Sequence, residues 1–284
     1  MRRALFASLA AVAAATALAA PAAHAATTPV TVYDATEHTN AGNVVSVGFE
    51  ATSASEFGDE VALAGTQRKL NAISTTMSTW ACQYGSWNAG NCASPNHTLT
   101  SPLSITLNIY AAGTPQSDGT VLPGALIAKA TKSFAIPYRP SANYDKCNTH
   151  NNASGKWWNA ADGKCYNGKK FTITFQFGSL GLTLPDDVVL GVAYNTSNFG
   201  YQPFGQSTAC YTADGGCFYD ALNVGLGSDG ITTGSKPNPG TVYQNTSWAG
   251  GLCDTTPALG VFNLDSPTSA CWAGTDVAFK VTAH

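Results

Sequence analysis

The chain has 284 residues, of which only 11% are charged, and a formal net charge of −3 at pH 7. A weakly acidic, charge-poor chain lacks the basic surface that nucleic acids and anionic lipids require, so we expect no nucleic-acid partner and no membrane insertion. Neutral partners such as polysaccharide or cell-wall glycan fit this composition better.

Residues 1–25 predict a secretory signal peptide. Met1-Arg2-Arg3 is a short positive region, an apolar run from Ala4 to Ala20 follows, and Ala23-His24-Ala25 fits an A-x-A cleavage site. The alternative is a membrane anchor, but the run is shorter and less apolar than the ~20 residues of a spanning helix. We therefore expect cleavage after Ala25 and a secreted, extracellular protein with a single domain over residues 26–284.

Strand signals recur along the rest of the chain. Apolar residues alternate with polar ones over residues 103–109, 171–177 and 277–281, which predicts half-buried strands. About ten short strands divided by Gly, Pro and Asn turns favour an all-β fold, an antiparallel, jelly-roll-like β-sandwich. Weaker strand candidates are Val30–Tyr33, Val44–Phe49, Leu70–Trp80, Ala125–Ile136, Val188–Tyr194, Leu222–Leu226 and Val242–Gln244.

Two stretches interrupt this rhythm, and we interpret residues 141–170 and 198–275 as long, disulfide-stapled insertions. An even number of cysteines in an exported chain predicts disulfides, and the absence of C-x-x-C argues against a metal. The sequence does not fix the connectivity, although the grouping favours four local pairs. These pairs are Cys82 with Cys92, Cys147 with Cys165, Cys210 with Cys217, and Cys253 with Cys271.

An acidic cluster, Glu50, Glu56, Asp59 and Glu60, places four carboxylates within eleven residues. One hypothesis is a structural Ca²⁺ site made by Glu50, Glu56, Asp59 and Asp276, because Ca²⁺ takes 6–8 oxygen ligands. A second is the carboxylate pair of a glycosidase, which has no sequence spacing to recognise. The third is that these are ordinary turn and edge residues. Calcium is the one cofactor that the sequence suggests.

Aromatic residues crowd the predicted disulfide loops and are the candidate ligand-binding groups. Sugar rings stack on aromatic faces, and neighbouring amides bond their hydroxyls. The alternative is that these rings form small cores beneath the insertions. For the Trp157-Trp158 pair, an extended backbone would direct one ring inward and the other outward. The candidate binding residues are Tyr84, Trp87, Trp157, Trp158, Asn159 and Tyr166.

Several segments are similar to a group of uncharacterised secreted actinobacterial proteins with a jelly-roll-like β-sandwich domain. The resemblance implies the fold and the extracellular location, and it brings no activity with it. The segments that carry it are Gly48–Thr52, Glu56–Val61, Ile105–Tyr110, Ile136–Pro140, Gly155–Trp158 and Asp220–Val224.

No catalytic motif stands out: H-E-x-x-H, G-x-S-x-G and P-loop patterns are missing, so we expect no enzyme. The first hypothesis for function is a secreted, non-catalytic module that binds glycan or cell wall. The second is a structural or interaction protein of the cell envelope or spore surface. The third is a glycoside hydrolase on a jelly-roll scaffold.

Overall fold

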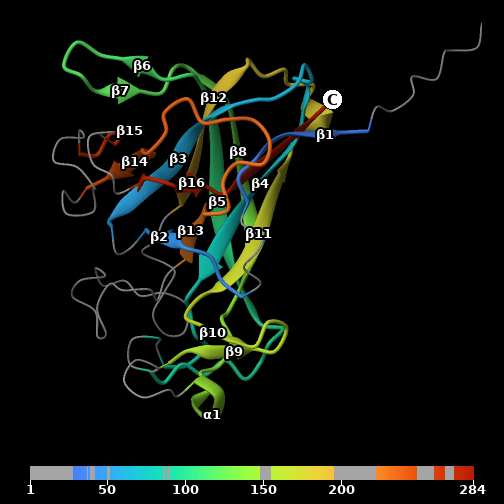
Figure 1. Ribbon diagram of the computed structural model, residues 1–284, viewed down its shortest axis with the longest axis vertical. Coiled ribbons are helices and arrows are strands. Elements are labelled where there is room, and N and C mark those ends of the chain that lie inside the picture. The colour runs from blue at the N-terminus through green and yellow to red at the C-terminus, as the bar shows by residue number, and fades with distance from the viewer. Residues whose placement is uncertain are drawn as a thin grey trace, which may run out of the picture.

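The computed structural model describes residues 28–36, 38, 42–49, 52–85, 87, 90–147, 155–194, 222–247, 259–265 and 272–284. Two antiparallel sheets form the upper and middle parts of the molecule in Figure 1, and a smaller region with β9, β10 and α1 lies below them. The all-β, antiparallel sandwich predicted from the sequence is confirmed.

The first sheet has seven strands arranged around β4 (Leu70–Thr79). On one side β11 (Lys169–Gln176) pairs with β4 along its whole length. On the other side β4 is shared, because β17 (Phe279–Ala283) pairs with its first half and β13 (Leu222–Gly227) with its end. Three short strands extend this side of the sheet: β1 (Val30–Asp34) beside β17, and β2 (Ser46–Gly48) and β16 (Asp276–Val277) beside β13.

The second sheet has six strands in the order β15-β14-β3-β12-β5-β8. Every neighbouring pair is antiparallel, and the longest pairing joins β5 to β8, each of which has 12 residues. The strands are β3 (Ala54–Ala62), β5 (Thr100–Ala111), β8 (Leu126–Pro137), β12 (Asp187–Tyr194), β14 (Tyr243–Thr246) and β15 (Asn263–Leu264).

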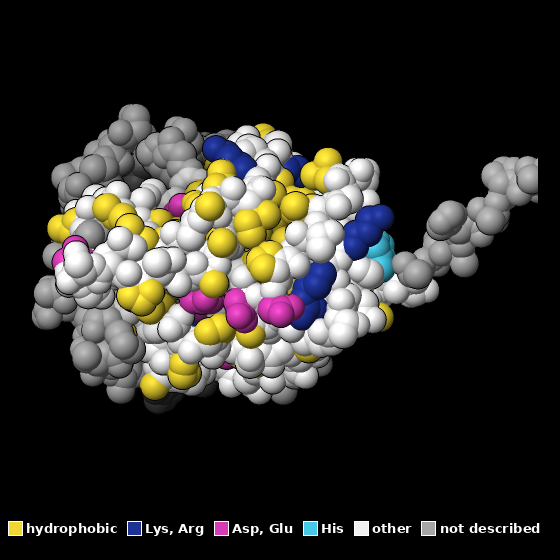
Figure 2. Space-filling view, turned by 90° about the horizontal axis from the view of Figure 1, so that it is seen from above, with side chains coloured by type: hydrophobic (Ala, Val, Ile, Leu, Met, Phe, Trp, Pro, Cys, Tyr) yellow, Lys and Arg dark blue, Asp and Glu magenta, His cyan; other side chains and the backbone are white. Residues whose placement is uncertain are grey.

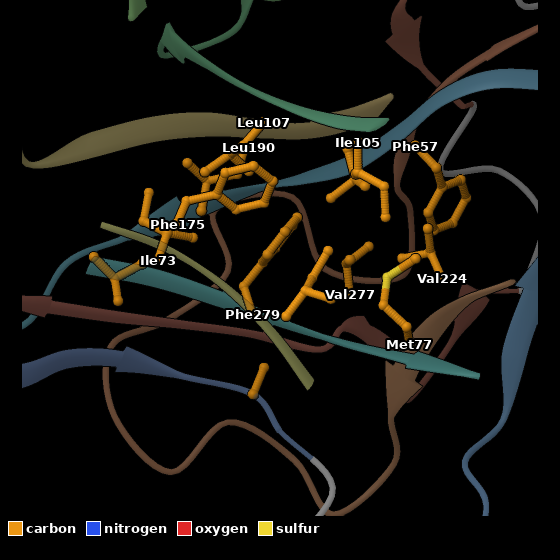
Figure 3. Close-up of a cluster of buried hydrophobic side chains, with 14 of the residues drawn as sticks. Phe57, Ile73, Met77, Ile105, Leu107, Phe175, Leu190, Val224, Val277 and Phe279 are labelled. Carbon is orange, nitrogen blue, oxygen red and sulfur yellow. The ribbon is translucent and has the colours of Figure 1, made fainter. Parts of the chain in front are cut away.

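The core lies between the two sheets (Figure 3). Because successive side chains of a strand point to opposite faces, every second residue of β5 enters it, and Ile105 and Leu107 have no exposed surface. From the other sheet Phe279 is fully buried and Phe175 nearly so. Burial of such side chains is the main stabilising contribution to a fold of this kind.

Short elements complete the chain. A hairpin of β6 (Thr114–Pro115) and β7 (Val121–Leu122) projects at the upper end in Figure 1, and the 3-10 helix η1 (Gly178–Leu180) follows β11. At the opposite end, the helix α1 (Tyr144–Cys147) precedes a second hairpin, made by β9 (Trp157–Asn159) and β10 (Lys164–Tyr166).

We call the described residues of 80–98 and 138–168 the disulfide lobe. Cys82–Cys92 closes a loop in the first segment and Cys147–Cys165 closes one in the second. Backbone hydrogen bonds join the segments, since the Arg139 N–H donates to the Ala81 carbonyl and the Ala142 N–H donates to that of Cys92. The two local disulfides are thus parts of one lobe.

The predicted strands over residues 103–109, 171–177 and 277–281 are confirmed as β5, β11 and β16–β17. The weaker strand candidates Leu222–Leu226 and Val242–Gln244 overlap β13 and β14, which pair with β4 and β3. Part of the stretch over residues 198–275 that we interpreted as an insertion therefore belongs to the two sheets. The predicted signal peptide lies outside the described residues.

Candidate functional site

A shallow groove of about 450 Å³ lies on the outer face of the six-stranded sheet. Its walls come from β3, β5, β8 and β12, so it rests on strands and not on loops. Among the described residues that line it, none carries a formal charge, and most have small side chains. They are Ala54, Ser55, Ser104, Thr106, Thr131, Ala193 and Tyr194.

Strand register explains why these side chains meet. Thr106 lies opposite Thr131 of β8 on one side and Ala193 of β12 on the other, and Ala193 lies opposite Glu56 of β3. One row of outward side chains therefore crosses four strands. The two threonine hydroxyls are 2.8 Å apart and hydrogen-bonded, which leaves each with further capacity to donate or accept.

Glu56 ends this row as a largely buried carboxylate, with 9% of its surface exposed. Its Oε1 accepts hydrogen bonds from Asn108 Nδ2 at 2.8 Å and from the Tyr110 hydroxyl at 3.0 Å. Burial raises the pKa of Glu56 above its ordinary value, although these two hydrogen bonds oppose the shift. Gly191 leaves room for the side chain, because a Cβ there would lie 2.1 Å from Glu56 Oε1.

Glu60 is four residues further along β3, about 13 Å at the usual rise of a strand. It has its own partners: the Gly113 N–H at 3.2 Å, Asn238 Nδ2 at 2.5 Å and the Tyr243 hydroxyl at 3.4 Å. Both glutamates are therefore occupied as acceptors by neighbouring groups. This arrangement is typical of a structural role for each carboxylate.

The tryptophan pair of β9 is divided between two faces. Trp157 is buried, with 7% exposed, and its Nε1 donates to the Gly168 carbonyl at 2.7 Å while its ring packs 5.6 Å from that of Tyr166. Trp158 points to the other face and is half-buried, with Lys146 Nζ 5.1 Å from its ring centre. Of the two rings, Trp158 is the one that a ligand could reach.

The other predicted binding residues of the lobe differ in exposure and in their contacts. Tyr84 is 61% exposed, whereas Trp87 is half-buried and packs edge-on against Trp80 at 4.9 Å. Asn159 accepts a hydrogen bond from the Ala161 N–H in the turn between β9 and β10. The Tyr166 hydroxyl donates to Asp162 at 2.5 Å. The structure thus assigns several of these side chains to the packing of the lobe.

The described carboxylates predicted to bind calcium do not form one site. Glu56 faces outward from β3, whereas Asp59 faces the core, where the Lys236 ammonium lies 2.7 Å from it and 3.6 Å from Asp276. Within the described residues no group of three or more His, Cys, Asp or Glu side chains could hold a metal ion. Glu50, the fourth predicted ligand, lies outside the described residues.

Two of the four predicted cysteine pairs are confirmed, Cys82–Cys92 and Cys147–Cys165. Cys210, Cys217, Cys253 and Cys271 lie outside the described residues. Disulfides are expected of proteins in oxidising compartments, so the two bonds fit an extracellular protein. Within the described part of the chain, no helix has the length and apolar character needed to cross a membrane.

The comparisons with known proteins bring no relative: no family model, no curated protein and no solved structure matches the chain. Any statement about the ligand therefore has to come from the surface of the protein itself. Figure 2 looks onto the upper end of the molecule, where uncharged side chains predominate and a short row of acidic side chains lies beside basic ones.

The groove was not predicted from the sequence. Its hydroxyls belong to the polar half of the alternation in β5, which predicted the strand but did not distinguish a binding face from plain solvent. The signal that could have found it is the run Ser104, Thr106, Asn108, Tyr110. These four residues share one face of β5, and no charged side chain is among them.

Proposed function

We propose that the protein is an exported, non-catalytic module that binds a neutral glycan, from a cell wall or from environmental polysaccharide, in the groove of the six-stranded sheet. The observation that carries this proposal is the uncharged row of Thr131, Thr106 and Ala193, which ends at the hydrogen-bonded carboxylate of Glu56. Export follows from the predicted signal peptide and fits the two disulfides.

The chemistry of the groove matches that of a sugar. Sugar hydroxyls both donate and accept hydrogen bonds, and so do the hydroxyls of Ser55, Ser104, Thr106 and Thr131. The floor is made by small side chains, which leaves space for a ring to approach the sheet. A shallow, wet site of this kind gives weak binding, so we expect a dissociation constant in the micromolar range or above.

The disulfide lobe supplies an alternative site for the same function. Trp158 and Tyr84 are its aromatic rings open to solvent among the predicted residues, and aromatic faces stack on sugar rings. The groove is favoured because its groups are placed by strand pairing, whereas these two rings are not brought into contact by any described interaction. The experiment below separates the two sites.

The test is retention of the oxidised, exported protein on insoluble polysaccharides and on purified peptidoglycan. Thr131→Arg places a long charged side chain beside the groove from the exposed face of β8, and should abolish retention. Thr172→Arg is the matched control, since Thr172 is exposed on β11 of the other sheet. It should leave retention unchanged.

Each other result overturns part of the proposal. Retention that survives Thr131→Arg but is lost in Trp158→Ala would move the site to the disulfide lobe. Failure to bind any polymer would contradict glycan binding and favour a structural protein of the cell envelope. Release of reducing sugar from a retained polymer would contradict the non-catalytic assignment and favour a glycoside hydrolase.

A further inference from the structure

Asp59 is a fully buried carboxylate inside the sandwich. It shares the inner face of β3 with Phe57 and Val61, which are also fully buried. Lys236, from the connection between β13 and β14, places its ammonium 2.7 Å from Asp59 Oδ2, and its side chain is only 4% exposed. A lysine is almost never buried to this extent without a partner, so the ion pair with Asp59 explains how the Lys236 side chain can be buried.

Backbone hydrogen bonds fix both side chains in place. Asp59 Oδ1 accepts from the Glu60 N–H at 3.0 Å, and Oδ2 accepts from the Val277 N–H at 3.3 Å. Lys236 is held because its neighbour Ser235 forms two backbone hydrogen bonds with Ala62, at 2.9 and 3.0 Å. The Asp59 carboxyl group is therefore held by backbone N–H groups, and the backbone next to Lys236 is anchored to β3.

A second carboxylate lies on the other side of the amine. Asp276 Oδ1 is 3.6 Å from Lys236 Nζ, and the Asp276 side chain is 14% exposed. The Lys236 ammonium also donates to the Thr275 carbonyl at 3.3 Å. One amine thus faces two carboxyl groups, of which one is wholly buried and the other reaches the edge of the core.

The surroundings of Asp59 favour its neutral form. Val277 is fully buried, and so is the hydroxyl of Tyr33, which has no hydrogen-bond partner among the described residues. Burial raises the pKa of Asp59 to about 7, against the lowering effect of Lys236. A proton that passes from the ammonium to Asp59 gives an amine beside a carboxylic acid, the two neutral groups that amide formation requires.

We propose that Lys236 and Asp59 join in an intramolecular isopeptide bond, with Asp276 as the acid–base group. After proton transfer, the Lys236 lone pair attacks the Asp59 carboxyl carbon. Asp276 takes a proton from the nitrogen and returns it to the departing hydroxyl group. A C–N bond forms, a C–O bond breaks and one water leaves, without oxidant or reductant. Fixed proximity replaces the chemical activation that amide formation otherwise needs.

The bond would tie β3 of one sheet to the connection that leads from β13 of the other sheet to β14. A cross-link between positions so distant in the chain restricts the unfolded state strongly, as a disulfide over a long loop does. Unlike a disulfide, an amide is not broken by reductants. In the presence of a reductant, the sandwich would then keep its covalent cross-link, whereas the disulfide lobe would lose its disulfides.

The mass of the full exported chain, denatured and reduced, tests this directly. We expect it to be lighter by one water than the sequence requires, and a protease digest to yield one peptide pair joined through Lys236 and Asp59. Lys280 and Asp34 are the matched control in the same digest. Their atoms are also 2.7 Å apart, but Lys280 is 39% exposed, so they should remain unlinked.

An unchanged mass would overturn the proposal and leave a buried ion pair, and water loss at any other pair would overturn it equally. Asp276→Asn tests the acid–base role. It keeps Lys236 and Asp59 but should abolish the loss of water in a chain that still shows the circular dichroism of the wild type. If the variant forms the bond as completely as the wild type, Asp276 has no part in the step.

Discussion

The sandwich and the disulfide lobe bury different kinds of side chain. Between the sheets, aliphatic and aromatic groups such as Phe279 and Ile105 meet across the core with no exposed surface. In the lobe, the buried groups include Trp80, Trp157, the cystine Cys82–Cys92 and Arg139, which is completely buried and donates to the Gly155 carbonyl. Removal of apolar surface from water is therefore the main source of stability in the sandwich, whereas the lobe combines a few apolar contacts with covalent and polar links.

The two regions should therefore unfold in different ways. The sandwich depends on a contact network that unfolds as one unit. The lobe depends on loop closure, so it can open locally while the sheets persist. Far-UV circular dichroism follows the sheets, and protease cleavage within the lobe follows its opening, so the two losses can be observed separately. Tryptophan fluorescence reports the lobe together with Trp272 in the core of the sandwich.

The largest effect is expected from Phe279→Ala. Phe279 is fully buried at the centre of the seven-stranded sheet, so the change should lower the free energy of unfolding by about 3–5 kcal/mol. Urea unfolding followed by circular dichroism measures it. The control is Leu180→Ala, at a residue that is 68% exposed, which should change stability by less than about 0.5 kcal/mol. Equal effects of the two changes would contradict the assigned core.

A smaller and local effect is expected from replacing both Cys147 and Cys165 with Ser. Their bond closes a separation of 18 residues, and loss of such a closure costs about 3 kcal/mol in the chain-entropy description. We expect altered tryptophan fluorescence and protease cleavage in the lobe, with the unfolding transition of the sheets retained. If the sheets unfolded together with the lobe, the two regions would not be separable.

Loss of Cys82–Cys92 serves as the comparison within the lobe. This bond closes a separation of 10 residues, so its removal should cost slightly less than that of the longer loop. The opposite order would show that native contacts, and not loop length, decide the stability of the lobe.

The strands could be predicted where apolar and polar residues alternate regularly, as in β5 and β11. Burial of one face of a strand requires an apolar residue at every second position. The position of Lys236 could not be predicted. It follows Gly234 and Ser235 in a polar stretch that reads as a surface turn, and only pairing of Ser235 with Ala62 carries the lysine beneath β3. A contact made by tertiary structure leaves no local pattern.

The candidate site was only partly accessible to the same reasoning. Aromatic residues drew attention to Trp157, yet a tryptophan in an insertion is as often its core as its binding surface, and the hydrogen bond to Gly168 shows the former. The pairing of Thr106 with Thr131 needed the register of β5 against β8. Register is set by the whole sheet and its turns, so a single strand does not reveal it.

The smallest effect lies within the sandwich and concerns the outer face of β3. Burial holds the pKa of Glu56 above its ordinary value of 4.5, so the folded state binds the proton more tightly than the unfolded state. The resulting stability is fully present below pH 4.5 and is lost as the pH rises through the folded pKa. Glu56→Gln removes this titration, so we expect the variant to gain stability relative to the wild type as the pH rises.

Melting temperatures of both proteins between pH 4 and pH 8 measure this gain, and Asp118→Asn provides a control of opposite sign. Asp118 is exposed and accepts a hydrogen bond from the Thr120 N–H, which lowers its pKa, so its contribution is present at neutral pH and lost on acidification. Two parallel pH profiles for the Glu56 and Asp118 variants would mean that burial on the outer face of β3 does not control the protonation of Glu56. The carboxylate would then be solvated, in spite of its hydrogen bonds to Asn108 and Tyr110.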